Sequence, residues 1–208
     1  MKGLLLKDIL TLKSTLKTYA ILIVFYAFLG IVTHNNFMAG FIAVFLSMIP
    51  ITALSYDERA NFSRYALTMP LSKAHLVLSK YLLGLVLSFF GGILTFVCIT
   101  FGGEDMTFVT TLFTTIAYIM MGLIFQALLL PIMFKFGSEK GRLYMLAVLF
   151  IPTLLIALLA ALPIGKPVSA FIESLDATVL VLGVIALALA LYVGSVLISI
   201  KIMNKKEF

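Results

Sequence analysis

The stretch YLLGLVLSFFGGILTFVCITF, residues 81–101, contains no Asp, Glu, Lys or Arg. A helix needs about 20 consecutive apolar residues to cross a bilayer core, so a stretch of this length predicts a transmembrane helix. Lipid cannot satisfy exposed backbone groups, and barrel strands would appear as alternating segments of about ten residues. We therefore expect an all-α membrane protein with six transmembrane helices. The five further uncharged runs are 18–33, 37–56, 108–134, 143–164 and 177–200.

The composition also indicates that the solvent is lipid. Of the 208 residues, 62% are hydrophobic and 12% are charged, whereas a soluble domain is about 45–50% apolar and about 25% charged. The six runs take up most of the chain, which leaves no room for a second folded domain. We expect residues 1–208 to form a single transmembrane domain, with spans 1–2 in residues 18–56 and spans 3–6 in residues 81–200.

The fourth run is the longest of the six. A helix over residues 108–134 either tilts or bends near Pro131, because proline lacks the N–H of one helical hydrogen bond. The polar segment that follows, residues 137–142, is expected to be an inner turn before the fifth span.

Lysine and arginine collect on one side of the expected membrane. Of the 15 Lys and Arg residues, 14 lie at the two termini or in the connections after spans two and four, and only Lys166 lies on the other side. Cytoplasmic loops retain such cations, so both termini are expected in the cytoplasm, with residues 201–208 as a tail. Because the cations lie in short loops and not on a solvated basic face, we expect no nucleic-acid partner.

The N-terminal residues 1–17 interleave lysine with leucine. On a helix, Leu5, Ile9, Leu12 and Leu16 fall on one stripe. We expect an amphipathic helix that lies on the inner leaflet before the first span.

The chain lacks the residues of a self-contained enzyme or pump. No span carries a charge, whereas ion-coupled carriers normally place ionisable groups at the midplane. The two histidines, His34 and His75, belong to no metal-ligand pattern, and no P-loop sequence is present. We therefore expect no catalytic residue, no metal and no cofactor bound by this chain.

One inner connection, residues 57–80, is far longer than a helical hairpin requires, since such connections commonly use about 2 to 8 residues. Apolar residues at helical spacing predict a short amphipathic helix over about 57–68, with an acidic pair in its first turn and an end at Met69–Pro70. Ser72 is then expected to cap a helix that continues into the third span. Such a helix either lies on the membrane or docks in a groove of a soluble partner. The apolar stripe consists of Phe62, Tyr65, Ala66 and Met69.

This connection resembles a known family. The stretch DERANFSRYALTMPLSKAHLVLSKYL, residues 57–82, is similar to the segment between spans two and three of small type-2 ATP-binding-cassette permeases, in particular bacterial exporters of phenol-soluble modulins and similar amphipathic or antimicrobial peptides. The resemblance rests on Asp57-Glu58, Arg64-Tyr65, Leu67 to Lys73 and Lys80-Tyr81-Leu82.

The resemblance implies a permease subunit in a bacterial plasma membrane. Such a subunit forms a homodimer, or a heterodimer with a paralogous permease, and works with two separate ATPase subunits that bind ATP and Mg²⁺. The residue 1–17 helix would be the elbow helix, and the cargo would be an amphipathic peptide. The match is weak on the outer side, where residues 165–176 are too few for the large outer domain of bigger relatives. The coupling helix that contacts the ATPase would contain Asp57, Glu58, Arg59, Phe62, Arg64, Tyr65, Ala66 and Met69.

Three other classes remain open from the sequence. A six-span capture subunit of a vitamin importer would leave the long inner connection unexplained and should carry more polar anchors on its outer face. An intramembrane enzyme would require a buried acid, base or metal cluster. A structural membrane protein without transport activity is compatible with the spans alone.

Overall fold

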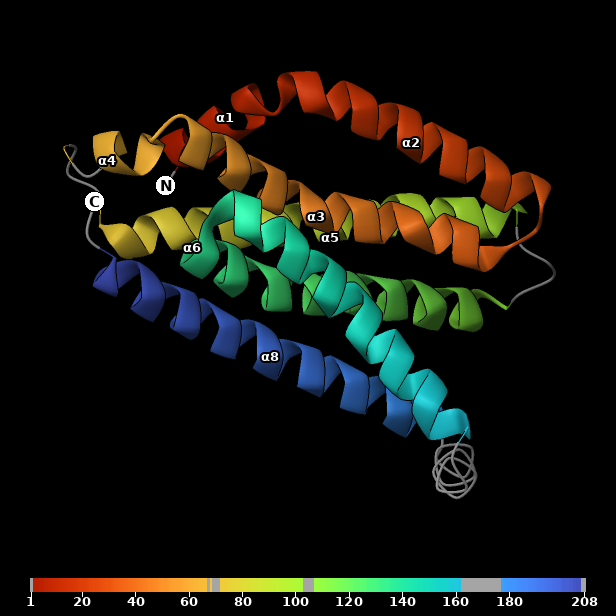
Figure 1. Cartoon of the computed structure of the whole chain (residues 1–208). Helices are drawn as coiled ribbons and strands as arrows, with labels where there is room; N and C mark the ends of the chain where they lie inside the picture. The colour runs from red at the N-terminus through yellow and green to blue at the C-terminus, as the bar shows by residue number, and fades with distance from the viewer. Residues whose placement is uncertain (1, 67, 69–71, 103–106, 162–176, 207–208) are drawn as a thin grey trace.

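The computed structural model describes residues 2–66, 68, 72–102, 107–161 and 177–206, and these form a bundle of helices without strands (Figure 1). The start of α1, the short helix α4 and the end of α8 gather at the same end of the bundle (Figure 1). The elements are α1 (Lys2–Thr11), α2 (Lys13–Val32), α3 (Asn36–Arg59), α4 (Phe62–Ala66), α5 (Lys73–Gly102), α6 (Phe108–Ala161) and α8 (Ala177–Lys205).

Five helices in the described residues are long and apolar enough to cross a membrane. The all-helical membrane fold is therefore confirmed at this level. The expected fifth span, residues 143–164, is helical up to Ala161 as the second arm of α6, and its last three residues lie outside the described part. The count of six spans stays a prediction. The five segments are Thr15–Val32, Asn36–Arg59, Lys73–Gly102, Phe108–Ser138 and Val181–Lys205.

Helix α3 lies at the centre of the bundle. In the most apolar 18-residue stretch of α3, 61% of the residues are buried. The corresponding share is 6% for α2 and 17% for α8. Glycines allow neighbouring helices to approach closely: a Cβ at Gly91 of α5 would meet the Cα of Ala43 at 2.9 Å. The α2 and α8 surfaces that remain exposed are apolar, as expected for surfaces that face lipid.

The turn between α2 and α3 is set by polar residues. The α2 helix ends at Val32, and His34 has a φ of +52°. The Asn35 side chain then caps α3, because its Oδ1 accepts a hydrogen bond from the Phe37 N–H at 3.0 Å. The His34 ring nitrogen Nδ1 lies 2.7 Å from the Gly102 carbonyl oxygen, which ties this turn to the end of α5.

Helix α6 is a hairpin of two helical arms. Its one non-helical residue is Gly137, with φ +80° and ψ 176°, a conformation that glycine adopts without steric penalty. The chain reverses there, and the second arm returns along the bundle (Figure 1). The helix continues through Pro131, so the predicted tilt or bend there stays a prediction. The reversal at Gly137 lies at the first residue of the expected inner turn, and residues 138–142 already belong to the second helical arm.

The boundaries of the inner connection also differ from expectation. The acidic pair Asp57 and Glu58 lies in the last turn of α3, which extends to Arg59, and not in the first turn of a separate helix. The span was predicted to end at its first charge, but Glu and Arg are good helix formers and continue it. The helix expected from Ser72 is confirmed, as α5 begins at Lys73 and the Ser72 Oγ accepts from the His75 N–H at 3.3 Å.

The helix boundaries at the two ends of the chain differ from the expected ones. The first span was predicted to begin at residue 18, but α2 begins at Lys13, directly after a turn at Leu12. At the other end, α8 continues to Lys205, so residues 201–205 are helical. The cytoplasmic tail over 201–208 stays a prediction.

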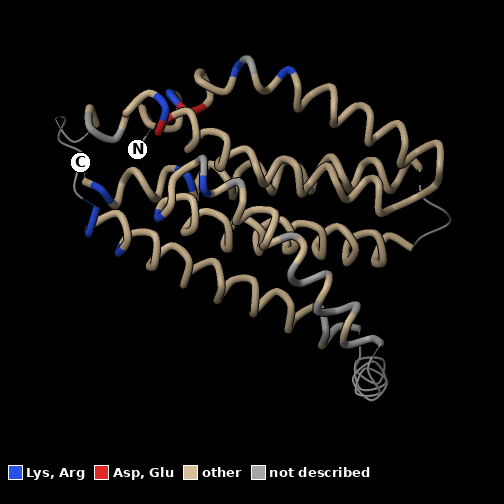
Figure 2. Tube along the Cα trace, in the orientation of Figure 1, with Lys and Arg blue, Asp and Glu red and all other residues tan. Residues whose placement is uncertain are grey.

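The charged residues gather in one half of the bundle (Figure 2). All Lys, Arg, Asp and Glu residues of the described ranges lie on α1, the start of α2, the end of α3, α4, the start of α5, the α6 reversal, or at the end of α8 and directly after it. We call this the charged end. The candidate site lies there.

Candidate functional site

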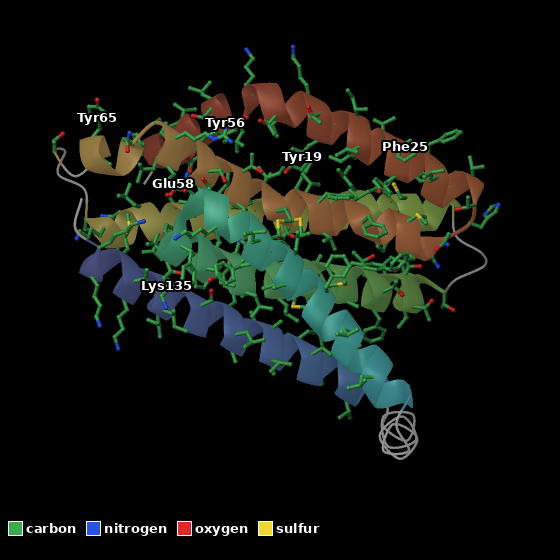
Figure 3. The ribbon with its side chains drawn as sticks, viewed as in Figure 1. Tyr19, Phe25, Tyr56, Glu58, Tyr65 and Lys135 are labelled. Carbon is green, nitrogen blue, oxygen red and sulfur yellow. The ribbon has the colours of Figure 1, made fainter. Side chains whose placement is uncertain are left out.

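Helix α4 is a short element at the charged end, preceded by Asn61 with a φ of +50°. One face of α4 is anchored: Ala66 is fully buried and Phe62 packs against the same hydrophobic cluster. Tyr65 points away from the bundle (Figure 3) and is 66% exposed. The predicted stripe is therefore split, because Phe62 and Ala66 face inward while Tyr65 faces outward. Met69 lies outside the described residues, and the Arg64 side chain is not described.

Beside α4, four charged residues from three helices form an ion-pair network (Lys7, Asp8, Asp57 and Lys80). The Lys80 Nζ lies 2.6 Å from Asp8 Oδ1 and 2.6 Å from Asp57 Oδ2. The Lys7 Nζ lies 2.5 Å from Asp57 Oδ1 and 2.9 Å from Asp8 Oδ1. The Asp8 and Lys80 side chains are only 1% and 3% exposed.

The network is electrically neutral, which explains how these charges can be withdrawn from water. Each ion loses hydration on burial, and the loss is compensated only when oppositely charged partners are in direct contact. Two lysines face two aspartates here, so every charge has two partners. The arrangement holds the middle of α1, the end of α3 and the start of α5 in one relative position.

Lys7 also connects the network to α4. Its Nζ lies 3.7 Å from the centroid of the Phe62 ring, a cation–π contact. Phe62 of α4 is therefore in direct contact with the network that joins α1, α3 and α5.

Glu58 connects the end of α3 to the α6 reversal (Figure 3). Its carboxylate accepts a hydrogen bond from the backbone N–H of Ser138, the first residue of the second α6 arm. A carboxylate is favourable at a helix N-terminus because it meets unpaired N–H groups and the positive end of the helix dipole. Adjacent residues of α3 thus contact different parts of the bundle, Asp57 the network and Glu58 the α6 hairpin.

Hydroxyl groups hold α2 against α3 next to the charged end. The Thr15 Oγ1 lies 3.0 Å from the Tyr56 Oη, and the Tyr19 Oη lies 3.2 Å from the Thr52 Oγ1. Next to these pairs is a cavity of about 220 Å³ between α2, α3 and the two arms of α6, and Arg59 is among its lining residues. Arg59 therefore contributes to this cavity and not to the ion-pair network.

Helix α8 is attached to α5 by buried hydroxyl groups. The Tyr81 Oη lies 2.5 Å from Ser195 Oγ and 2.8 Å from Ser199 Oγ. The Tyr192 hydroxyl in turn donates to the Tyr81 carbonyl at 2.7 Å. At the end of α8, the Lys73 Nζ donates to the Lys206 carbonyl at 2.8 Å. Through these hydrogen bonds α5, which carries Lys80 of the ion-pair network, is also joined to α8, the last helix.

The expected elbow residues do not share one buried stripe. Leu12 is buried, Leu5 and Leu16 are partly buried against the same cluster, and Ile9 is half exposed. The residues of α1 and the following turn that face the bundle at four-residue spacing are Leu4, Asp8 and Leu12.

The pattern of apolar residues did not single out the ion-pair network. Asp57 was predicted as a coupling-helix residue and Lys80 as part of its motif, whereas Lys7 was expected only as one of the cytoplasmic cations and Asp8 had no predicted role. The available signal was the aspartate in an otherwise basic and apolar segment, placed between Leu4 and Leu12 on one helical face. The partner of Asp8 is 72 residues away in sequence, so no local pattern identifies it.

The site offers no metal-binding arrangement in the described residues, where no three His, Cys, Asp or Glu side chains lie together. The described geometry consists of a short anchored helix with one exposed aromatic residue, Tyr65. Its Phe62 contacts the network of α1, α3 and α5, and Glu58 separately joins α3 to α6.

Comparison with protein families identifies the class. The family described as ABC-2 family transporter protein matches residues 3–204, nearly the whole chain. The chain belongs to this family, the membrane component of ATP-binding-cassette transporters, and is a multi-pass membrane protein. Comparison with curated proteins found no match.

Proposed function

We propose that the chain is the permease subunit of an ABC exporter, and that α4 with the end of α3 is its coupling segment. ABC-2 permeases work with an ABC ATPase, and this chain would rest on two such subunits that bind ATP and Mg²⁺. The observation that carries the proposal is α4 itself: Phe62 and Ala66 anchor it, and Tyr65 remains exposed beside a buried ion-pair network.

The expected mechanism is a shift between bundle conformations. ATP binding would draw the ATPases together, and α4 would move with them. Lys7 would pass that movement to α1, α3 and α5, and Glu58 would pass it to the α6 hairpin. Because the charges are buried and closely paired, small displacements change their energy strongly, which favours discrete arrangements over continuous deformation.

We also propose six spans with both termini in the cytoplasm. The second α6 arm is helical throughout residues 138–161, and the charged end fits the cytoplasmic side because cytoplasmic segments retain Lys and Arg. In this arrangement α1 is the elbow helix, whose exposed Leu6, Ile9 and Leu10 suit the inner leaflet.

The cargo we propose is an amphipathic peptide, moved out of a bacterial cell. This proposal rests on the resemblance of residues 57–82 to the corresponding segment of peptide exporters. The permease would pair with a second copy or with a paralogous permease.

The test is copurification of the Tyr65→Asp variant with its ATPase from native membranes in mild detergent. Wild type should bring down a soluble subunit with a P-loop, identified by mass spectrometry. Tyr65→Asp should reduce its yield at least tenfold, because a charge replaces an exposed aromatic contact. Thr33→Asp, an exposed residue at the other end of the bundle, is the matched control and should match wild type.

An equal ATPase yield for Tyr65→Asp and Thr33→Asp would show that α4 is not the coupling segment. A wild-type chain that comes down without any P-loop subunit would contradict the permease proposal itself.

A further inference from the structure

The cavity between α2, α3 and α6 is polar at one end and apolar at the other. Its α3 wall follows a single helical face from Met48 to Arg59, about 17 Å at the usual rise per residue. The wall begins at the charged end with Arg59, continues through hydroxyl-bearing residues and ends with apolar ones. In this order it consists of Arg59, Tyr56, Ser55, Thr52, Ile51 and Met48.

The opposite walls are mostly apolar. Met133 and Met145 come from the two arms of α6, and α2 contributes Tyr19. Tyr19 and Tyr56 lie between α2 and α3 in Figure 3. Methionine is flexible and polarizable, so a wall with Met48, Met133 and Met145 can adapt to a linear apolar chain.

Arg59 differs from its neighbours on α3 in having no assigned role in the fold. Asp57 is held in the ion-pair network and Glu58 bonds to Ser138. Within the described residues, the Arg59 guanidinium has neither an ion pair nor a side-chain hydrogen bond. A cation at the mouth of a cavity favours an anionic group, and guanidinium suits phosphate through paired N–H donors.

We propose that this cavity binds an anionic membrane lipid, with the headgroup phosphate at Arg59 and part of one acyl chain along Ser55, Thr52 and Met48. The volume, about 220 Å³, is below the roughly 300–1,000 Å³ of pockets that enclose drug-sized ligands. It therefore accepts part of a single chain and not a folded peptide. The mostly unburied α2 places the site next to the bilayer that supplies the lipid.

The experiment is lipid titration of the purified full-length chain, followed by native mass spectrometry. The probes are single-chain phosphatidylglycerol and single-chain phosphatidylcholine with the same acyl chain. The wild-type chain should bind one phosphatidylglycerol at least tenfold more tightly than phosphatidylcholine. Arg59→Gln should remove this preference, whereas Lys13→Gln, an exposed lysine at the same end but outside the cavity, should keep it.

A second pair of variants tests the acyl-chain position. Ser55→Leu would fill the cavity and should weaken binding of both lipids at least tenfold, while Ser55→Ala should bind like wild type. The Ser55 Oγ donates only to the Ile51 carbonyl of its own helix, so neither change removes a contact between helices.

Equal binding of the two lipids by wild type would overturn the proposal, as would equal losses in Arg59→Gln and Lys13→Gln or unchanged binding by Ser55→Leu. Binding of an amphipathic peptide but of neither lipid would also overturn it. The outcome is independent of ATPase association, so it does not depend on the proposed coupling role of α4.

Discussion

At the scale of single residues, the account depends on the buried charges Asp8 and Lys80. Each is almost completely inaccessible, and their Oδ1 and Nζ atoms are 2.6 Å apart. Replacing such a pair by apolar residues is often neutral, whereas removal of one partner leaves an uncompensated buried charge. We therefore expect the network mainly to determine the position of α1 relative to α5, and to contribute little to the net free energy of unfolding.

We predict that Asp8→Leu lowers the free energy of unfolding by about 3–5 kcal/mol, because Lys80 loses its most buried partner. The double variant Asp8→Leu with Lys80→Met should recover most of this loss, since Lys7 and Asp57 remain as a neutral pair. The measurement is the fraction of monodisperse protein after heating in mild detergent. A double variant as unstable as the sum of both single variants would show that Asp8 and Lys80 are not energetically coupled, and would contradict the prediction.

The contacts and orientations of individual side chains were the hardest features to predict from the sequence. The stripe Phe62, Tyr65, Ala66 and Met69 predicted a short helix over about 57–68, and the structure has α4 over Phe62–Ala66. Helical spacing alone did not show that Tyr65 faces outward. The pairing of Asp8 with Lys80 depends on how α1 folds back against the bundle. Such a contact is a consequence of the tertiary structure and not of local periodicity.

At the scale of elements, the end of α3 and the reversal of α6 form a single unit. Glu58 caps the second α6 arm at Ser138, and Gly137 lies directly against the carboxylate. The uncharged runs predicted where the long apolar helices lie in the sequence, because a bilayer imposes a minimum length on such runs. Their ends were less predictable, since helices continue through charged residues once they leave the lipid.

We predict that Gly137→Ala destabilises the chain by roughly 1–2 kcal/mol, because a non-glycine residue with positive φ is strained. The added Cβ would also meet the Glu58 carboxylate. Adding Glu58→Ala should not restore stability, because it relieves the contact but also removes the cap on the Ser138 N–H and leaves the backbone strain. Gly183→Ala in α8, where a Cβ meets nothing within 4 Å, is the control in the same heating assay. Wild-type stability in Gly137→Ala would contradict the tight reversal.

At the scale of the whole molecule, the charged end and the apolar spans together define an orientation. The single cysteine, Cys98, can be replaced by alanine to give a background for labelling. In that background Thr33→Cys should react with a membrane-impermeant maleimide in intact cells. Thr68→Cys and Asn204→Cys should react only after the membrane is permeabilised. Labelling of Thr68→Cys in intact cells would reverse the proposed orientation.

The most direct test of the central claim is site-specific photocross-linking in native membranes. A photoreactive phenylalanine analogue would replace Tyr65 on α4 or, as control, Phe101, which is 79% exposed at the other end of α5. The account predicts a cross-link from position 65 to a P-loop ATPase subunit and none from position 101. Cross-links from position 65 to lipid alone, in membranes that contain the ATPase, would contradict the assignment of α4 as the coupling helix.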